Sequence, residues 1–350
     1  MACKYCYLSA SSIGIKKLSE NKFLDILNFL HEEKNHKVVF VFSSGGENTL
    51  NFDLMKKIPF LCRENGFLDC SFDLITNGTI FTNEMIDFFK SNNFTLHISL
   101  DGDKKTNDKN RVYPNGRGSY DDVYDNLCLL KENGLAFSCN VLLQFDSDNV
   151  IEVFQFFEEN KIHFNYDFPV DSLDGRFIPD TSGLDQWLMQ FETIMDFYKQ
   201  RIENNCSVYA DKLIKDIKRI HFGVTNGFAC NASIDSIHIG ISGSIYPCSY
   251  NSGSEELCIG TIYSGLDYDK IVKSKLYAKQ VDCYDSCREC WIKYLCSGGC
   301  FGLKWVSGGD TDKPTSYNCM IKKSYWEAVV KLYIRLSRYI KENSLFDYNS

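Results

Sequence analysis

Residues 96–102, LHISLDG, have a form that recurs through the first half of the chain: a short apolar run that ends in a polar, glycine-containing tip. Residues 38–47 (VVFVFSSGGE) and 72–78 (FDLITNG) share it. A longer amphipathic stretch follows each of these runs, at residues 120–134, 54–66 and 85–93 respectively. This alternation predicts parallel strands joined by right-handed helical crossovers, with ligands bound at the carboxyl ends of the strands.

The alternation continues toward the carboxyl terminus and then stops. Two further strand patterns, at 136–146 and 163–171, flank a helical pattern at 150–160. Further helices are predicted by the apolar periodicity at 183–205, 209–220 and 322–343. Near residues 222–229 the composition changes to a cysteine-rich segment of weaker periodicity. We therefore expect an α/β sheet or barrel followed by a second, cysteine-rich unit.

Composition excludes several classes of protein. The chain has 350 residues, of which 44% are hydrophobic and 14% aromatic, so it can bury a full core. It has no run of eighteen apolar residues and no secretory signal pattern, so we expect a cytoplasmic protein that does not enter a membrane. The net charge is −8 and the lysines are scattered, which disfavours nucleic-acid binding.

Sixteen cysteines are unusual for a cytosolic chain. Structural disulfides are rare under reducing conditions, which leaves metal binding as the better use of many thiolates. Five scattered cysteines lie in apolar patterns and are predicted to fill the core: Cys62, Cys70, Cys128, Cys139 and Cys206.

The remaining cysteines include the strongest motif of the chain, residues 287–300, CRECWIKYLCSGGC. Its four cysteines have the spacing C-x2-C-x5-C-x3-C; upstream, Cys230, Gly243 and Cys248 give C-x12-G-x4-C, and Cys319 follows downstream. Zinc could use any four of these thiolates. Seven thiolates exceed one zinc site and suit two iron–sulfur clusters.

This set of spacings resembles the SPASM domain of radical S-adenosylmethionine enzymes, and all seven of its positions are matched. The resemblance implies two auxiliary [4Fe–4S] clusters, one held by Cys230, Cys248 and Cys300 and the other by Cys287, Cys290, Cys296 and Cys319. The first of these sets has three ligands. Its fourth is left open between Cys258, Cys283 and the substrate.

The amino terminus, MACKYC, resembles the end of the radical enzyme signature C-x3-C-x2-C, with Cys3 and Cys6 as its second and third cysteines and Tyr5 as its aromatic. The resemblance implies a first [4Fe–4S] cluster that binds S-adenosylmethionine. It also implies that the first cysteine and the first barrel strand lie before Met1, an expectation that the DNA upstream of Met1 would test. A thioredoxin-like redox pair is the alternative interpretation of CKYC.

Strand tips supply the other residues that the resemblance assigns to S-adenosylmethionine. Gly45, Gly46 and Glu47 resemble the segment that meets the amino group of the cofactor, while a glycine pair after a strand is otherwise a plain turn. Arg111 resembles an arginine that pairs with the carboxylate of the cofactor, a planar match that lysine could not copy. The remaining candidates are Asn77 in LITNG, Ser99 in LHISLDG, and Val170 against the adenine.

The resemblance implies a partial (β/α)6 TIM-like barrel that lacks its first strand, followed by a SPASM domain with two iron–sulfur clusters. The expected boundaries are residues 1–175 for the barrel, 176–225 for bridging helices, 226–325 for the SPASM domain and 326–350 for a final helix. The catalytic residues stay unassigned.

The implied activity is oxidative modification of a peptide or protein, and the segment DKNRVYPNGRGSYDDVYDNL favours thioether formation in a ribosomally made peptide. Flavodoxin or ferredoxin would be a suitable electron donor. Anaerobic sulfatase maturation is the alternative, although Ser249 stands where those enzymes have an aspartate. The third candidate is a truncated protein that binds clusters but has no catalytic activity.

Overall fold

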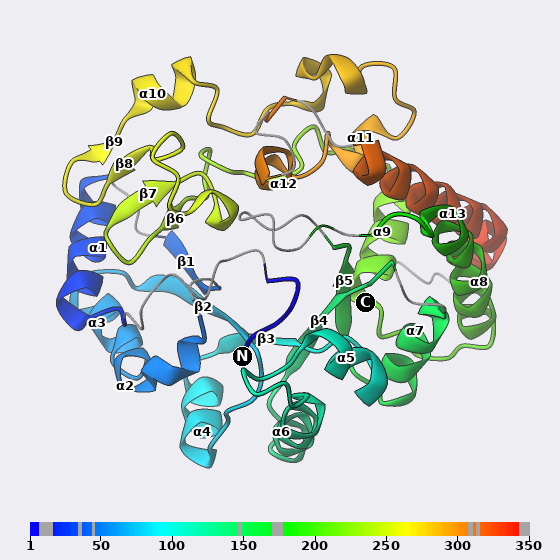
Figure 1. Ribbon diagram of the computed structural model, residues 1–350, viewed down its shortest axis with the longest axis horizontal. Helices are drawn as coiled ribbons and strands as arrows, with labels where there is room; N and C mark the ends of the chain where they lie inside the picture. Colours follow the sequence, from blue (N-terminus) through cyan, green and yellow to red (C-terminus); the bar gives the residue numbers. More distant parts are fainter. Residues whose placement is uncertain are drawn as a thin grey trace.

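The computed structural model describes residues 1–6, 17–33, 37–43, 46–145, 149–169, 178, 180–306, 311–312 and 316–342. Five parallel strands form one sheet in the order β1-β2-β3-β4-β5. They are β1 (Lys37–Phe42), β2 (Asp69–Thr76), β3 (Phe94–Ser99), β4 (Phe137–Leu142) and β5 (Phe164–Asp167). The predicted parallel α/β sheet is thus confirmed, and it curves as the lower arc of Figure 1.

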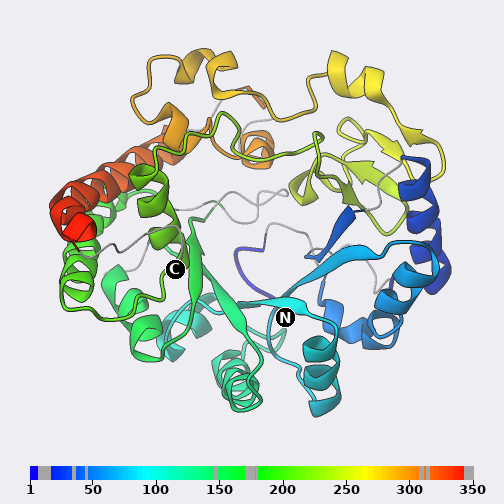
Figure 2. The same ribbon diagram turned by 180° about the vertical axis from the view of Figure 1, so that it is seen from behind.

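Helices cover the convex face of this sheet (Figures 1 and 2). They are α1 (Glu20–Glu32), α2 (Phe52–Met55), α3 (Ile58–Glu64), α4 (Asn83–Ser91), α5 (Lys104–Asn110), α6 (Tyr120–Glu132) and α7 (Val150–Glu159). Several begin at a capping side chain: Thr82 accepts a hydrogen bond from the N–H of Met85, and Asp103 from that of Thr106. Polar residues at the strand tips therefore also start the crossover helices.

The strand register gives the sheet one apolar and one polar face. Side chains that alternate along β2, β3 and β4 are fully buried under the helices, among them Leu74, Leu96, Ile98 and Cys139. The residues between them point to the concave face and are exposed or partly so. This face carries Asp73, His97, Ser99, Asn140, Asn165 and Asp167. Val39 and Val41 of β1 are its exposed apolar residues. A partly exposed and mainly polar face is suited to line a ligand cavity rather than a core.

Three long helices flank β5, and they confirm the predicted helices of the second half. They are α8 (Leu184–Glu203), α9 (Asp211–His221) and α13 (Ser316–Glu342), and α8 and α13 lie side by side in both ribbon views. Tyr325 of α13 donates to Asp216 of α9 at 2.7 Å and lies 2.9 Å from the hydroxyl of Tyr166 in β5. Helix α13 begins at Ser316, six residues before the start that the sequence pattern predicts. Cys319 therefore lies in its first turn.

The cysteine-rich region forms the upper arc of Figure 1, opposite the parallel sheet. It contains a small antiparallel sheet of β6 (His238–Ile239), β7 (Ser244–Tyr246), β8 (Gly260–Thr261) and β9 (Gly265–Leu266). The short helices α10 (Tyr268–Lys273), α11 (Lys293–Cys296) and α12 (Phe301–Val306) follow. Four 3-10 turns complete the described elements: η1 (Asn48–Asn51), η2 (Ser249–Asn251), η3 (Val281–Cys283) and η4 (Asp285–Cys287).

The prediction for the scattered cysteines is confirmed for two and wrong for two. Cys62 and Cys139 are fully buried and Cys70 is half-buried, but Cys128 and Cys206 are exposed. The buried stripe of α6 consists of Val123, Leu127 and Leu130, so Cys128, one residue after Leu127, points away from the core. Cys206 lies just beyond the end of α8, where no neighbouring element covers it.

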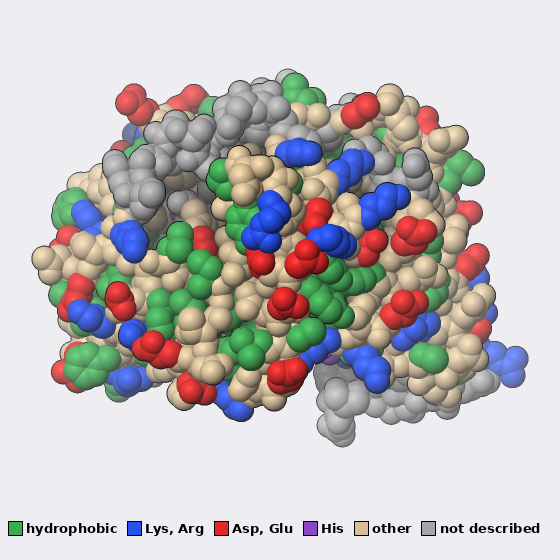
Figure 3. Space-filling view, turned by 60° about the horizontal axis from the view of Figure 1, so that its bottom comes forward, with side chains coloured by type: hydrophobic (Ala, Val, Ile, Leu, Met, Phe, Trp, Pro, Cys, Tyr) green, Lys and Arg blue, Asp and Glu red, His purple; other side chains and the backbone are tan. Residues whose placement is uncertain are grey.

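Surface charge agrees with the composition. Lysine, arginine, aspartate and glutamate are interspersed over the face shown in Figure 3, without a basic stripe on that face. Among the described helices, none combines the length and the apolar character needed to cross a bilayer.

Candidate functional site

The amino-terminal cysteines lie in a turn that is docked on the loop after α5. The N–H of Cys6 donates to the carbonyl of Cys3 at 3.2 Å, which closes the turn. The N–H groups of Ala2 and Lys4 donate to the carbonyls of Val112 and Asn110 at 2.7 and 3.0 Å. Backbone pairing therefore holds the Cys3–Cys6 turn beside Arg111. Burial raises the pKa of the Cys3 thiol, and the Arg111 charge partly offsets that effect.

Asp101, just beyond the end of β3, organises this site. It is 1% exposed. One carboxylate oxygen accepts from Nη2 of Arg111 and from the N–H of Leu142, both at 2.9 Å, and the other accepts from the hydroxyl of Tyr5. Burial also raises the pKa of Tyr5 well above its usual range. The predicted Tyr5 and Arg111 are thus brought together by an aspartate whose role the sequence did not indicate.

Arg111 retains one unused donor. Its side chain is almost fully buried, and its Nε has no hydrogen-bond partner. Burial alone would lower the pKa of Arg111, but the charges of Asp101, Tyr5 and Cys3 outweigh it and raise that pKa above its ordinary value. The guanidinium is therefore a fixed cation with an unused donor, which fits a carboxylate-bearing ligand.

A second group of predicted residues meets at the tips of β1 and β2. Glu47 accepts from the hydroxyl of Thr76 at 2.7 Å and from the N–H of Asn77 at 2.8 Å. Gly46 directly precedes Glu47 in the described chain. The Glu47 carboxylate thus fixes neighbouring tips to each other, a positioning role that the sequence did not indicate. The predicted Gly45 and Val170 lie outside the described residues.

Ser99 ends β3 on the concave face, in register with Asn140 of β4. His97, one step below it on the same face, lies 2.9 Å from the Ser138 hydroxyl. The strand tips with Glu47, Asn77 and Ser99 therefore share one edge of the sheet with the Cys3–Cys6 turn, as the sequence predicts for a parallel α/β fold.

The carboxy-terminal cysteines fall into two neighbourhoods. We call Cys230, Cys248 and Cys300 the first set. The pKa of Cys248 is raised to about 12, chiefly by burial and then by the charges that Cys300 and Cys230 would carry. Burial raises the pKa of Cys300 as well, with a further contribution from Cys230. These mutual interactions show that the three sulfurs are neighbours.

The second set is Cys287, Cys290, Cys296 and Cys319. Burial raises the pKa of Cys296, and Cys287 and Cys290 add to that rise. Burial also raises the pKa of Cys319, again with contributions from Cys296, Cys287 and Cys290. The two neighbourhoods contain the same cysteines as the two ligand sets expected from the spacing.

The donor chemistry of these sets fits iron–sulfur ligation. All sixteen cysteines, every one of them among the described residues, are free thiols. Within the described parts of the chain, no group of three or more His, Cys, Asp or Glu side chains is placed to hold a single metal ion. Thiolates of a four-iron cube surround the cube instead of converging on one ion, so two neighbourhoods of thiols are what two cubes require.

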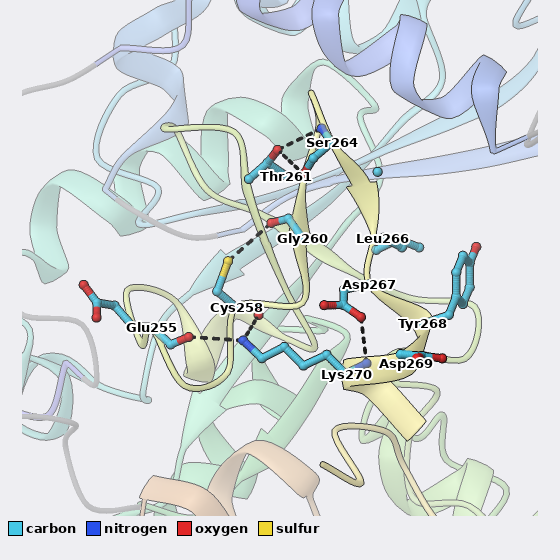
Figure 4. Close-up of a pocket in the computed structure, with 11 residues that line it drawn as sticks. Glu255, Cys258, Gly260, Thr261, Ser264, Leu266, Asp267, Tyr268, Asp269 and Lys270 are labelled. Atoms are coloured by element: carbon cyan, nitrogen blue, oxygen red, sulfur yellow. Dashed lines mark hydrogen bonds between the residues drawn. The ribbon is translucent and has the colours of Figure 1, made fainter. Parts of the chain in front are cut away.

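The two candidates for the missing ligand differ in their surroundings. Cys258 donates its thiol to the carbonyl of Gly260 at 3.3 Å and lines the open pocket of about 790 Å³ shown in Figure 4. Lys270 donates to the carbonyls of Cys258 and Glu255 across the same pocket. Cys283 is exposed. The fourth ligand of the first set stays a prediction.

Comparison with known proteins gives a family model and several relatives to which the chain is similar. Residues 1–157 match the family model of the radical SAM superfamily. The chain is 22% identical, over 94% of its length and 86% of the relative's, to the serine-type anaerobic sulfatase-maturating enzyme of Bacteroides thetaiotaomicron. It is also 22% identical to a cysteine-type enzyme of Clostridium perfringens, over 97% and 96% of the two chains.

Solved structures show the same fold. The structure of native anSMEcpe with bound AdoMet matches with a TM-score of 0.81 at 20% identity, over 97% of this chain and 96% of that one. Streptococcus suis SuiB bound to S-adenosylmethionine matches with a TM-score of 0.60 at 17% identity, over 90% and 73%. The fold therefore extends through the cysteine-rich region of the chain.

Proposed function

We propose that the protein is a radical SAM enzyme with a SPASM domain that oxidatively modifies a peptide or protein. The observation that carries the proposal is the division of seven buried or half-buried thiols into two neighbourhoods, within a fold that matches anSMEcpe over 97% of the chain. The family match of residues 1–157 supports the radical chemistry.

The amino-terminal site would bind the reacting cofactors. With a reduced [4Fe–4S] cluster, S-adenosylmethionine supplies a carbon-centred radical that removes a hydrogen atom from an unactivated position. Cys3 and Cys6 would contribute cluster thiolates. Nε of Arg111 is available for the cofactor carboxylate, while Asp101 holds the guanidinium in place. The ends of β1 and β2, which Glu47 links through its hydrogen bonds, would orient the cofactor. The buried surroundings of the site would exclude water.

The concave face would admit the substrate. It lies between the cofactor edge of the sheet and the cysteine-rich region, and it is mainly polar along β3, β4 and β5, with Val39 and Val41 exposed on β1. Two structures with the same fold contain peptides: anSMEcpe with the Kp18Cys peptide, and SuiB with its precursor peptide SuiA. These support a peptide as the substrate class.

The bond formed separates two candidate activities. Thioether formation in a ribosomally made peptide is the first. The second is sulfatase maturation, which is favoured by relatives of that name that align over most of the chain. Ser249, which follows Cys248 and opens η2, places a hydroxyl where a carboxylate base would be needed, and this residue favours the first candidate.

The test is anaerobic reconstitution followed by incubation with S-adenosylmethionine, dithionite and a cysteine-containing peptide. We expect more than eight irons per chain, since two auxiliary cubes account for about eight, together with 5′-deoxyadenosine. A product that has lost hydrogen but kept its sulfur indicates a thioether; an aldehyde that reacts with hydroxylamine indicates formylglycine.

Two cysteine variants test the separate roles of the amino-terminal and the cysteine-rich region. Cys6→Ala should abolish 5′-deoxyadenosine, whereas Cys290→Ala should preserve it but lose the peptide product. Zinc in place of iron would overturn the proposal. About eight irons without any nucleoside would instead indicate an inactive cluster-carrying protein.

A further inference from the structure

Helix α12 separates the two cysteine sets. Cys300, the last cysteine of the first set in the chain, directly precedes it. A Cβ placed on Gly302 would lie 2.7 Å from Sγ of Cys248, so this face of α12 packs tightly against the first set. Lys304 is two residues further on, which rotates it by roughly 200° about the helix axis. It therefore faces away from Cys248 and toward the second set.

Lys304 is a buried cation whose ammonium lacks a partner. It is 4% exposed, and its Nζ has no hydrogen-bond acceptor. The ammonium lies 3.3 Å from the centre of the Tyr284 ring, whose faces attract cations. Tyr284 packs with Cys287 of the second set. Gly298 allows this packing, because a Cβ there would lie 2.9 Å from the Tyr284 ring.

The charges around Lys304 come from both sets. Burial lowers its pKa, and Cys287, Asp312, Cys296 and Cys300 oppose that effect. Asp312 already pairs with Lys279, and lies 3.9 Å from Lys275. Cys287 and Cys296 belong to the second set and Cys300 to the first. The thiols of both sets are therefore the uncommitted groups that this cation faces.

Burying an ammonium without a counterion costs free energy, and buried ammonium groups are usually found where an anion compensates their charge. Tetrathiolate-ligated four-iron clusters carry net negative charge, and reduction adds one more electron. Hydrogen bonds and nearby charges set the potential of such clusters. A cation between the two sets would favour the reduced form of either cluster.

We propose that Lys304 is a shared positive charge between the two auxiliary clusters that raises the reduction potential of both. This inference rests on the proposed function, because it requires the clusters. Lys304 acts through the clusters and not on the substrate. Accepting one electron from the substrate radical, which is thereby oxidised, would make the cluster more negative, and Lys304 would stabilise that added charge without transferring a proton.

The test is a redox titration of the iron-loaded protein, monitored by electron paramagnetic resonance. In Lys304→Met we expect at least a tenfold loss in the equilibrium constant for reduction of the auxiliary clusters, which for one electron is a shift of about 59 mV to more negative potential. Lys304→Arg keeps the charge and should stay close to wild type. Lys293→Met is the matched control, because its ammonium is already paired with Asp282 at 2.9 Å.

Each outcome decides the inference. Unchanged potentials in Lys304→Met at wild-type iron content would overturn it, while the proposed function would stand. Loss of iron in Lys304→Met but not in Lys304→Arg would support the inference, because it would show that the clusters need the positive charge at this position. Loss of iron in both variants would overturn it in favour of a packing role. Failure of wild-type protein to bind iron would overturn the proposed function itself.

Discussion

The two cysteine regions each enclose one buried cation, but they treat it differently. At the amino-terminal site, Arg111 is paired with Asp101 at 2.9 Å, and Asp101 also accepts from Tyr5 and the backbone of Leu142. In the cysteine-rich region, Lys304 has an aromatic ring beside it and no hydrogen-bond acceptor. One cation is paired directly with a carboxylate, and the other faces thiols that must ionise and Asp312, which already pairs with Lys279.

The difference indicates when each region becomes complete. The Asp101–Arg111 pair balances its own charge, so the amino-terminal site is organised before any cofactor binds. Lys304 has no directly paired carboxylate, and thiolates that hold clusters would supply most of the compensating charge, so the cysteine-rich region should gain most of its stability on cluster binding. The predictions below test this contrast.

Removing the counterion of Arg111 should have the largest effect. Asp101→Ala leaves a buried guanidinium unpaired and deprives Tyr5 and Leu142 of an acceptor, so we expect a loss of about 3–5 kcal/mol in the free energy of unfolding. Urea denaturation of the metal-free protein measures it. Asp121→Ala, which breaks an exposed ion pair with Lys104, should have little effect. A loss below about 1 kcal/mol in Asp101→Ala would show that the site does not depend on this pair.

The neighbouring glycines of CSGGC offer a matched pair of substitutions in the other region. Gly298 and Gly299 both have positive φ, of 81° and 77°. A Cβ on Gly298 meets the Tyr284 ring at 2.9 Å, whereas one on Gly299 meets nothing within 4 Å. Gly299→Ala should lose about 1 kcal/mol from backbone strain alone, and Gly298→Ala about 2–3 kcal/mol. Equal losses in the two urea titrations would mean that the Tyr284 contact contributes nothing.

Removing the unpaired cation should have a smaller effect of opposite sign. In metal-free protein, Lys304→Met replaces an isolated buried charge by an apolar side chain of similar length, so we expect a gain of about 1–2 kcal/mol. Anaerobic urea unfolding with a chelator present measures it. Lys293→Met again serves as the control. A loss of stability in the metal-free Lys304→Met variant would show that the ammonium is already compensated without clusters.

Sequence patterns predicted the parallel sheet because periodicity and strand-end glycines are local properties. They also predict two cysteine ligand sets from the spacing, and this assignment stays a prediction. They could not predict that Asp101 would join Tyr5 to Arg111, since ninety-six residues separate Tyr5 from Asp101. Lys304 was missed for a different reason. A lysine in FGLKWV reads as a surface residue unless its apolar neighbours are taken as a sign of burial.

The partly exposed ion pair between Arg117 and Asp122, near Arg111, should contribute less to the free energy of unfolding than the buried Asp101–Arg111 pair. Arg117 donates to Asp122 at 2.6 Å, and Tyr113 donates to the same carboxylate. The hydrogen bonds from Arg117 and then Tyr113 lower the pKa of Asp122 below 3.8. A lowered carboxyl pKa contributes stability above the unfolded-state pKa and loses it as the pH falls through the folded-state value.

Asp122→Asn should therefore cost less stability than Asp101→Ala or either glycine substitution, and only at pH values above the acid range in which this carboxyl is protonated. The difference from wild type should decrease as the pH of the urea titration falls through the lowered folded-state pKa, and it should shrink in high salt because the pair is partly exposed to solvent. A difference that persists in acid would assign the effect to packing of the Tyr113 ring instead. Because Asp101 is 1% exposed and Asp122 is not buried, unequal losses at the two carboxylates would measure what burial adds to an otherwise similar arginine–aspartate pair.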